Sequence, residues 1–256
     1  MLFDTHTHLN DPDLMGRAAE LIEEARLTGV ALMVVPGYDR ESSLKAIDLA
    51  ERFDTIYAAV GFHPHDAKHV TDRDLDDLQA WCKHQKVVAI GEIGLDYHYD
   101  NSPVDIQDRV FREQIGVAKK TGLPIVIHDR EAHADIIKVL QETDAKSVGG
   151  IMHCYSASAE MMPQFLAFGF YISLGGPVTF KNGKKPIQAA KDVPLDRLLL
   201  ETDAPYLTPE PFRGKQNQPA YVRYVAQKIA DIREVSVKEI EDATYANALR
   251  AFHLEA

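Results

Sequence analysis

Histidines and carboxylates of this sequence stand where short apolar runs end. His6-Thr7-His8 closes the first run. Side chains two residues apart on an extended segment share a face, so both imidazoles can reach one metal ion. Glu92 interrupts the apolar run AIGEIGL, where a carboxylate is costly to bury unless it is paired or metal-bound. These two motifs point to a metal site with nitrogen and oxygen ligands.

The same pattern returns three more times along the chain. His128 ends PIVIH, His153 ends GGIMH, and Asp203 ends LLLETD, two residues before a proline that stops a strand. Taken singly, the motifs also fit surface histidines, a buried ion pair or a core histidine bonded to a carbonyl, but their shared position favours metal binding. Four imidazoles and two carboxylates suit two divalent ions, with Zn²⁺, Mn²⁺ and Mg²⁺ all open. The candidate ligands are His6, His8, Glu92, His128, His153 and Asp203.

Two further carboxylates lie one strand layer deeper. Asp4 precedes His6 by two residues and Glu201 precedes Asp203 by two, so each shares a face with a candidate ligand on an extended segment. We interpret Asp4 and Glu201 as carboxylates that orient the ligand imidazoles.

Eight β-rich runs carry these residues, and helical patterns separate them. The runs cover residues 2–8, 30–37, 56–63, 87–94, 124–128, 150–154, 170–175 and 198–203. Apolar residues with helical spacing fill 13–28, 41–53, 72–84, 104–120, 132–142, 159–167 and 185–191, and further helices occupy 220–253 with a break at 235–236. Eight such units predict an α/β fold, a (β/α)₈ TIM barrel in a single domain over 1–256. The candidate ligands would converge at the mouth formed by the strand ends.

The charge balance limits what the protein can bind. The 256 residues include 39 Asp and Glu against 28 Lys and Arg, for a formal charge of −11, together with 11 His. Non-specific affinity for duplex DNA comes mainly from cations that neutralise phosphates, so this chain should not coat a duplex. Two cysteines are too few for a disulfide scaffold. Without an apolar run of about 18 residues or a signal-peptide pattern, we expect a cytoplasmic protein with no membrane span.

In this order the motifs resemble the TatD family of metal-dependent hydrolases, a branch of the amidohydrolase-type barrels. The matching segments are DTHTHLN (4–10), GFHPHD (61–66), GEIGLDYH (91–98), HDREA (128–132), HCYS (153–156), ETDAPYLTP (201–209) and RGKQNQPAYV (213–222). The resemblance therefore covers nearly the whole chain. Asp129, Ala157 and Gln218 depart from the residues usual in the family without removing a ligand.

The resemblance implies a binuclear site and a reaction. One ion would be held by His6, His8 and Asp203, the other by His128 and His153, and Glu92 would bridge them. The implied activity is that of a deoxyribonuclease, a phosphodiesterase that acts on DNA ends. We expect Asp203 and Glu92 to be the catalytic residues, with Asp203 both a ligand and the acceptor of a proton from the attacking water.

Phosphate recognition would need local cations, because the total charge is unfavourable. The loops after strands 7 and 8 often bind phosphate in this fold. The predicted substrate contacts are His63, Arg130, Arg213, Lys215 and Asn217, and weaker candidates are Lys181, Lys184 and Lys185, which also fit a solvated helix start. Tyr97, His98 and Tyr206 are candidates for stacking on a base or sugar.

The leading hypothesis is a divalent-metal-dependent phosphodiester hydrolase, a deoxyribonuclease or exonuclease acting on single-stranded DNA ends. An amidohydrolase or lactonase of a small molecule would use the same metal site, and an uncharged, apolar mouth would favour it. A catalytically silent metal- or nucleotide-binding module is the third hypothesis, which the complete ligand set disfavours. We expect a monomer without an obligate protein partner.

Overall fold

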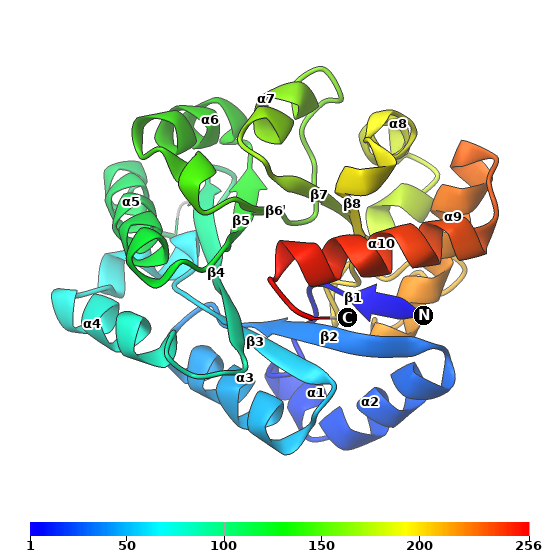
Figure 1. Ribbon diagram of the computed structural model, residues 1–256, viewed down its shortest axis with the longest axis horizontal. Coiled ribbons are helices and arrows are strands. Elements are labelled where there is room, and N and C mark those ends of the chain that lie inside the picture. The colour runs from blue at the N-terminus through cyan, green and yellow to red at the C-terminus, as the bar shows by residue number, and fades with distance from the viewer. Residues whose placement is uncertain (100, 256) are drawn as a thin grey trace.

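Eight parallel strands form the centre of the molecule. The computed structural model describes residues 1–99 and 101–255, and each strand pairs with the next in the order β1 to β8 (Figure 1). Backbone hydrogen bonds from Thr5 N to Leu200 O (3.0 Å) and from Asp203 N to His6 O (2.9 Å) bring the last strand against the first and nearly close the barrel. The strands are β1 (Leu2–Asp4), β2 (Val30–Pro36), β3 (Ile56–Val60), β4 (Val87–Asp96), β5 (Ile125–Arg130), β6 (Gly150–Met152), β7 (Tyr171–Leu174) and β8 (Leu198–Leu200).

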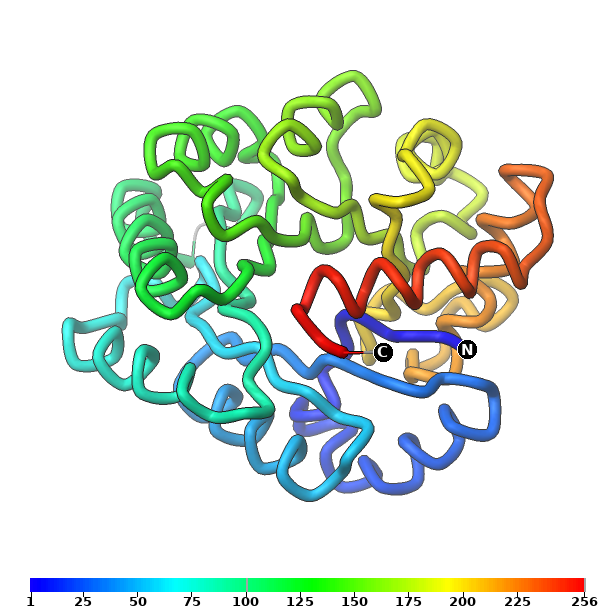
Figure 2. Tube along the Cα trace, viewed as in Figure 1, coloured from blue at the N-terminus to red at the C-terminus, as the bar shows by residue number. Residues whose placement is uncertain are grey.

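Helices alternate with the strands and surround them (Figures 1 and 2), which confirms the predicted (β/α)₈ barrel. The α-helices are α1 (Pro12–Met15), α2 (Ala18–Leu27), α3 (Arg40–Arg52), α4 (Asp72–Trp81), α5 (Val104–Thr121), α6 (His133–Glu142), α7 (Met162–Ala167), α8 (Lys184–Asp192), α9 (Val222–Arg233) and α10 (Val237–Ala251). Short 3₁₀ helices are η1 (Pro64–His69), η2 (Ala145–Ser147), η3 (Gly176–Thr179), η4 (Leu195–Arg197) and η5 (Pro219–Tyr221). None of the described helices is long and apolar enough to cross a membrane.

One end of the barrel is filled by apolar side chains. Phe3 of β1 packs with Leu249 and Phe252, and the rings of Phe3 and Phe252 stack with their centroids 5.8 Å apart. Asn247 of α10 donates to Leu198 O at the start of β8 (2.8 Å), so α10 covers the end where the strands begin. Figure 2 shows the C-terminus beside the first strand. The residues that follow the strands therefore lie at the opposite end.

Local sequence sets where helices begin and end. Asp39 caps the start of α3 through two reciprocal hydrogen bonds. Its carboxylate accepts from Ser42 N (2.7 Å), and the Ser42 hydroxyl accepts from Asp39 N (2.9 Å). α5 ends at Thr121, and the next residue, Gly122, has a φ of 73°, a left-handed conformation that favours glycine. The continuous helix predicted over 13–28 is wrong, because the chain turns at Gly16 and divides it into α1 and α2.

The first predicted strand is longer than the observed one. β1 ends two residues before His6, so His6 and His8 lie in the segment that follows the strand. There the backbone bonds to both neighbours in turn, because Thr7 N donates to Val34 O (3.1 Å) and His8 N donates to Ala204 O (2.8 Å). This path ends the regular ladder but keeps the histidines between β2 and β8, at the mouth.

Candidate metal centre

A cavity of about 720 Å³ opens at the end of the barrel where the strands finish. Its size lies within the usual range of about 300–1,000 Å³ for small-molecule sites. It brings together these predicted residues: His8, His63, Glu92, His128, Arg130, His153 and Asp203. His6 is only 1% exposed and faces the same cluster through its Nε2 atom.

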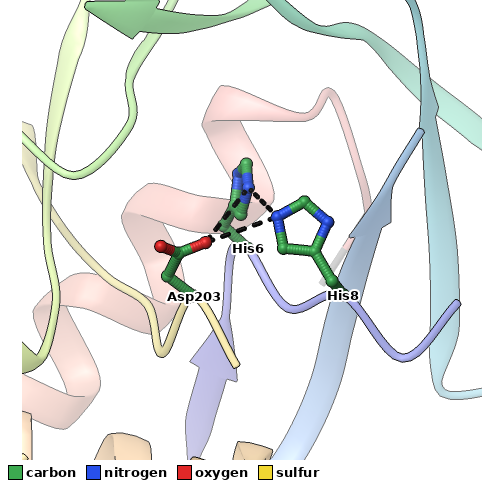
Figure 3. Close-up of side chains that lie close together, drawn as sticks. All are labelled: His6, His8 and Asp203. Carbon is green, nitrogen blue, oxygen red and sulfur yellow. Dashed lines mark hydrogen bonds and ion pairs between the residues drawn. The ribbon is translucent and has the colours of Figure 1, made fainter. Parts of the chain in front are cut away.

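His6, His8 and Asp203 form a first group of donor atoms (Figure 3). The Nε2 atoms of His6 and His8 are 3.2 Å apart, and Asp203 Oδ1 lies 3.8 Å from the first and 3.3 Å from the second. Glu92 Oε2 lies 3.3 Å from His6 Nε2 and 3.8 Å from His8 Nε2. Ligands about 2.1 Å from a common tetrahedral centre are about 3.4 Å apart, so these four atoms can hold one divalent ion.

The other oxygen of Glu92 faces a second group of imidazoles. Glu92 Oε1 lies 2.8 Å from His128 Nδ1 and 3.7 Å from the Nε2 atoms of His63 and His153. The donor atoms of His63, Glu92 and His128 all lie within 4.8 Å of one another. His63, which we predicted as a substrate contact, is therefore close enough to be a ligand.

The alternative of a buried ion pair to lysine or arginine does not hold for Glu92. Its partners among the described residues are imidazoles, and it is 4% exposed. A carboxylate in such surroundings carries a high desolvation cost, which a divalent cation offsets. The donor chemistry of the cluster, imidazole nitrogens with carboxylate oxygens, fits a metal ion.

Burial and the carboxylates divide the imidazoles into two kinds. Burial lowers the pKa of His6 below its usual value and that of His63 well below it. Burial alone would also lower the pKa of His128 and His153, but hydrogen bonds and charge from nearby carboxylates outweigh it and raise these values to about 9 and about 10. In the metal-free protein, His128 and His153 therefore carry protons at neutral pH.

The two cluster carboxylates are ionised. Burial alone would raise the pKa of Glu92 and Asp203, but the surrounding imidazoles outweigh burial in both cases. They hold the pKa of Glu92 well below its usual value and that of Asp203 below it. Both carboxylates can therefore bind a cation without first losing a proton.

Carboxylates behind the cluster hold two of the imidazoles in place. Glu201 Oε2 accepts from His153 Nδ1 (3.1 Å), which leaves His153 Nε2 facing the cluster. Asp96 Oδ2 lies 2.9 Å from His128 Nε2 and 2.9 Å from His65 Nε2. Each carboxylate thus orients a ring from the side away from Glu92.

Asp4, predicted to orient an imidazole, contacts Thr202 instead. Its Oδ2 accepts from Thr202 Oγ1 (2.6 Å) and its Oδ1 from Thr202 N (2.9 Å), while a longer bond reaches the backbone of His6 (3.4 Å). The regular strand ends at Asp4, so the alternation that would have placed its carboxylate behind the His6 ring is lost. Asp4 joins β1 to the segment after β8.

Three predicted substrate contacts do not line the cavity. Arg213 stacks over the ring of Phe180 (3.9 Å), and the Lys215 ammonium lies over the ring of Phe212 (5.5 Å). Asn217 is fully buried, and its amide donates to two backbone carbonyls (2.8 and 2.6 Å). These side chains hold the loop after β8 in place, and Arg213 also joins it to Phe180 in the segment after β7. Of the predicted substrate contacts, His63 and Arg130 line the cavity.

The predicted stacking residues also divide. Tyr206 is 53% exposed and lines the cavity. Tyr97 donates its hydroxyl to Asp135 (2.8 Å), and His98 pairs with Glu131 (2.9 Å), so both have partners outside the cavity lining.

Sequence reasoning missed two residues that contact the cluster, His65 and Asp96. A signal was present for each. His65 follows His63 by two residues, as His8 follows His6, and Asp96 follows Glu92 by four, an even spacing along β4. Tyr38 and Tyr99 also line the cavity, but they lie in segments whose sequence carries no such period.

A parallel eight-stranded barrel with imidazoles and carboxylates gathered at its mouth defines the class of barrel-fold metal-dependent hydrolases. The chain belongs to the TatD family, because residues 3–253 match the family described as TatD related DNase. It is therefore a TatD-family metal-dependent hydrolase and an enzyme.

Relatives agree with this placement. The chain is 51% identical to the uncharacterized metal-dependent hydrolase YabD of Bacillus subtilis over 254 residues, which cover 99% of this chain and 100% of YabD. It is 36% identical to YcfH of Escherichia coli (strain K12), also described as an uncharacterized metal-dependent hydrolase, over 100% of this chain and 97% of YcfH. The crystal structure of YjjV, described as a TatD homolog from Escherichia coli K12, has a TM-score of 0.93 at 31% identity and covers 99% and 98% of the two chains.

Proposed function

We propose that this protein is a deoxyribonuclease that shortens single-stranded DNA from its ends with the help of two divalent ions. The observation that carries the proposal is that the two oxygens of Glu92 face different groups of histidines. Its Oε2 faces His6 and His8, and its Oε1 faces His128. A pair of ions about 3.5–4 Å apart is a common arrangement in nucleases and phosphatases, where it stabilises both the attacking and the leaving oxygen. The family description supports a nucleic-acid substrate.

The proposal gives each of the six predicted ligands a role. The ligands would be His6, His8 and Asp203 for one ion, His128 and His153, which both face Glu92 Oε1, for the other, and Glu92 for both, with Zn²⁺, Mn²⁺ and Mg²⁺ as candidates. When bound, the ions would supply an activated water at neutral pH and offset charge on the phosphoryl oxygens.

Asp203 would accept the proton that the attacking water loses. Imidazoles hold its pKa below the usual value, so it is ionised before the reaction. Its Oδ1 lies 3.3 Å from His8 Nε2 and 3.9 Å from His153 Nε2, within reach of groups that stabilise either protonation state.

Arg130 would bind the phosphate. It is the arginine that lines the cavity, and its guanidinium lies over the ring of Tyr99 (4.6 Å). A guanidinium can donate two parallel hydrogen bonds to a phosphate group. Arg130 adds to the cavity lining a permanent positive charge that is not part of the candidate ligand set, and this favours an anionic substrate over the amidohydrolase or lactonase alternative. One chain supplies every residue of the cluster, so the proposal needs no second subunit.

The test is cleavage of single-stranded DNA labelled at the 3′ or the 5′ end. Protein stripped with a chelator should be inactive, and reloading with Zn²⁺, Mn²⁺ or Mg²⁺ should restore progressive shortening from one end. Elemental analysis of the active protein should find about two ions per chain. Undiminished turnover by the stripped protein would contradict the proposal.

Variants separate chemistry from folding. His128→Ala and Asp203→Asn should each lower kcat by about 10²–10⁴-fold with unchanged circular dichroism. His84→Ala is the matched control, because His84 pairs with Glu51 (3.0 Å) outside the cavity, and it should keep full turnover. Hydrolysis of amides or lactones without any cleavage of DNA would replace the proposal with the alternative.

A further inference from the structure

A second cavity, of about 320 Å³, adjoins the first beside β7 and the start of α8. The two cavities share Cys154, Ser156 and Pro177 as lining residues, so they lie side by side at the mouth of the barrel. The second cavity is further lined by Lys184 and Lys185.

The two cavities differ in charge. The lining of the first contains five carboxylates: Asp66, Glu92, Asp96, Asp129 and Asp203. The lining of the second contains none, and Asn182 adds an amide next to its two lysines. In a chain with a formal charge of −11, such a cationic cavity beside the cluster needs an explanation.

Lys184 and Lys185 have no carboxylate partner within 4 Å in the described part of the chain. The residues four positions on are Gln188 and Ala189, so no ion pair along the helix is available to either lysine. Elsewhere such pairs are formed, as between Lys238 and Asp242 (2.8 Å).

The charges in the first turn of α8 also oppose its helix dipole. Cations stabilise the C-terminal end of a helix and anions its N-terminal end. α8 has Lys184 and Lys185 in its first turn and no acidic residue there, while Lys191 and Asp192 close its last turn with opposite charges. An anion bound in the second cavity would relieve the repulsion that this arrangement creates.

We propose that the second cavity binds a phosphate of the DNA strand next to the one that is cleaved. This inference rests on the proposed function. A strand whose end lies at the cluster carries further phosphates at a short, regular spacing, and the second cavity is the adjoining cationic space. Lys184 and Lys185 therefore select strands of several nucleotides over substrates with a single phosphodiester.

The test compares two substrates and two double variants. Thymidylyl-thymidine carries only the phosphate to be cleaved, whereas the hexamer (dT)₆ carries others beside it. Lys184→Ala/Lys185→Ala should lower the ratio of kcat/KM for (dT)₆ to that for the dinucleotide about tenfold, the loss expected for a charge-assisted hydrogen bond. Lys119→Ala/Lys120→Ala removes an equally charged pair at the opposite end of the barrel, where α5 ends, and should leave the ratio unchanged.

Two further variants and a binding measurement complete the test. Lys184→Arg/Lys185→Arg keeps the charge and should keep the ratio. In the metal-loaded Asp203→Asn background, the anisotropy of labelled (dT)₆ is measured against salt concentration. Removing the two lysines should make the salt slope smaller by about 0.7 for each phosphate that they neutralise. Inorganic phosphate should compete weakly, since a single phosphate does not span both cavities.

The outcomes distinguish the two proposals. An unchanged ratio and an unchanged salt slope in Lys184→Ala/Lys185→Ala would overturn the phosphate subsite while leaving the nuclease proposal intact. Lysine-dependent binding of (dT)₆ with no cleavage under any metal would overturn the nuclease proposal while leaving the phosphate subsite intact. Competition by inorganic phosphate as strong as that by (dT)₆ would contradict the proposal that a DNA strand occupies the second cavity.

Discussion

Glu201 accepts a hydrogen bond from Nδ1 of His153 (3.1 Å) and leaves the Nε2 of the same ring facing Glu92 (3.7 Å). The second oxygen of Glu201 accepts from Cys154 N (2.8 Å), so the carboxylate is itself held in place. A ring held in this way has one tautomer and one orientation available for a metal.

Removing the charge of Glu201 should weaken metal binding. Glu201→Gln should lower the affinity for the divalent ion about 10–100-fold, because the amide orients the imidazole less firmly. Competition against a chelator of known affinity measures the change. Glu51→Gln alters an exposed glutamate that pairs with His84 (3.0 Å) and should leave the affinity unchanged; an equal loss in both variants would contradict the positioning role.

Glu92→Gln should affect both groups of ligands at once. Its two oxygens face His6 and His128 at 3.3 and 2.8 Å, so loss of the charge should lower metal content below two ions per chain and turnover by at least about 100-fold. Elemental analysis after dialysis and an initial-rate assay check this. The control is Glu131→Gln, another glutamate paired with a histidine, His98 (2.9 Å). Full metal content with full turnover would exclude Glu92 as a shared ligand.

Metal binding should release protons at neutral pH. His128 and His153 have pKa values of about 9 and about 10 without metal, and an imidazole nitrogen must lose its proton to become a ligand. Metal affinity should therefore rise with pH until it passes these values. Calorimetric titration of the ion in buffers of different ionisation enthalpy counts the protons, and the absence of any release at pH 7 would contradict the prediction.

The stability of the metal-free protein should fall as the pH rises, whereas the metal affinity should increase. The pKa of each of these two histidines is raised in the folded state above the usual value of 6.5. Their protonation stabilises the fold fully below about pH 6.5, and this contribution is lost as the pH rises through about 9 to 10. Urea unfolding of the stripped protein across this range measures it.

Substitution of Arg130 should weaken substrate binding, whereas substitution of Arg213 should lower the stability of the fold. Each guanidinium lies over an aromatic ring, at 4.6 Å for Arg130 and 3.9 Å for Arg213, but only Arg130 of the two lines the cavity. Arg130→Ala should raise KM for single-stranded DNA about tenfold. Arg213→Ala should leave KM unchanged and lower Tm. A larger KM effect from Arg213 would show that the loop after β8 closes over bound substrate.

Asp4→Ala should destabilise the fold without removing a ligand. It would leave the N–H and the hydroxyl of Thr202 without their acceptors in the interior, at a cost of about 1–3 kcal/mol each. Urea unfolding of the metal-free protein gives the loss. Asp4→Asn retains an acceptor oxygen and should lose less stability than Asp4→Ala. Equal losses of stability in the two variants would show that the charge of Asp4, and not its hydrogen bonds, stabilises the fold.

The sequence contains enough to predict the barrel and the residues that could bind metal. Strand and helix periods are local, and eight alternations in 256 residues leave few other folds. Glu92 was recognisable because a carboxylate in an apolar run needs a partner. The end of the first strand could not be predicted in this way, because the backbone after Asp4 bonds to neighbours that are distant in sequence.

Only the tertiary structure decides which groups face one another. Asp4 and Thr202 are 198 residues apart, and nothing in either segment predicts that the carboxylate binds Thr202 and not an imidazole. Arg213 and Asn217 lie in a loop without a period, so their direction depends on how that loop packs. Residue types and local periods follow from the chain itself, whereas the partition of Glu92 between two groups of histidines exists only once the strand ends have converged.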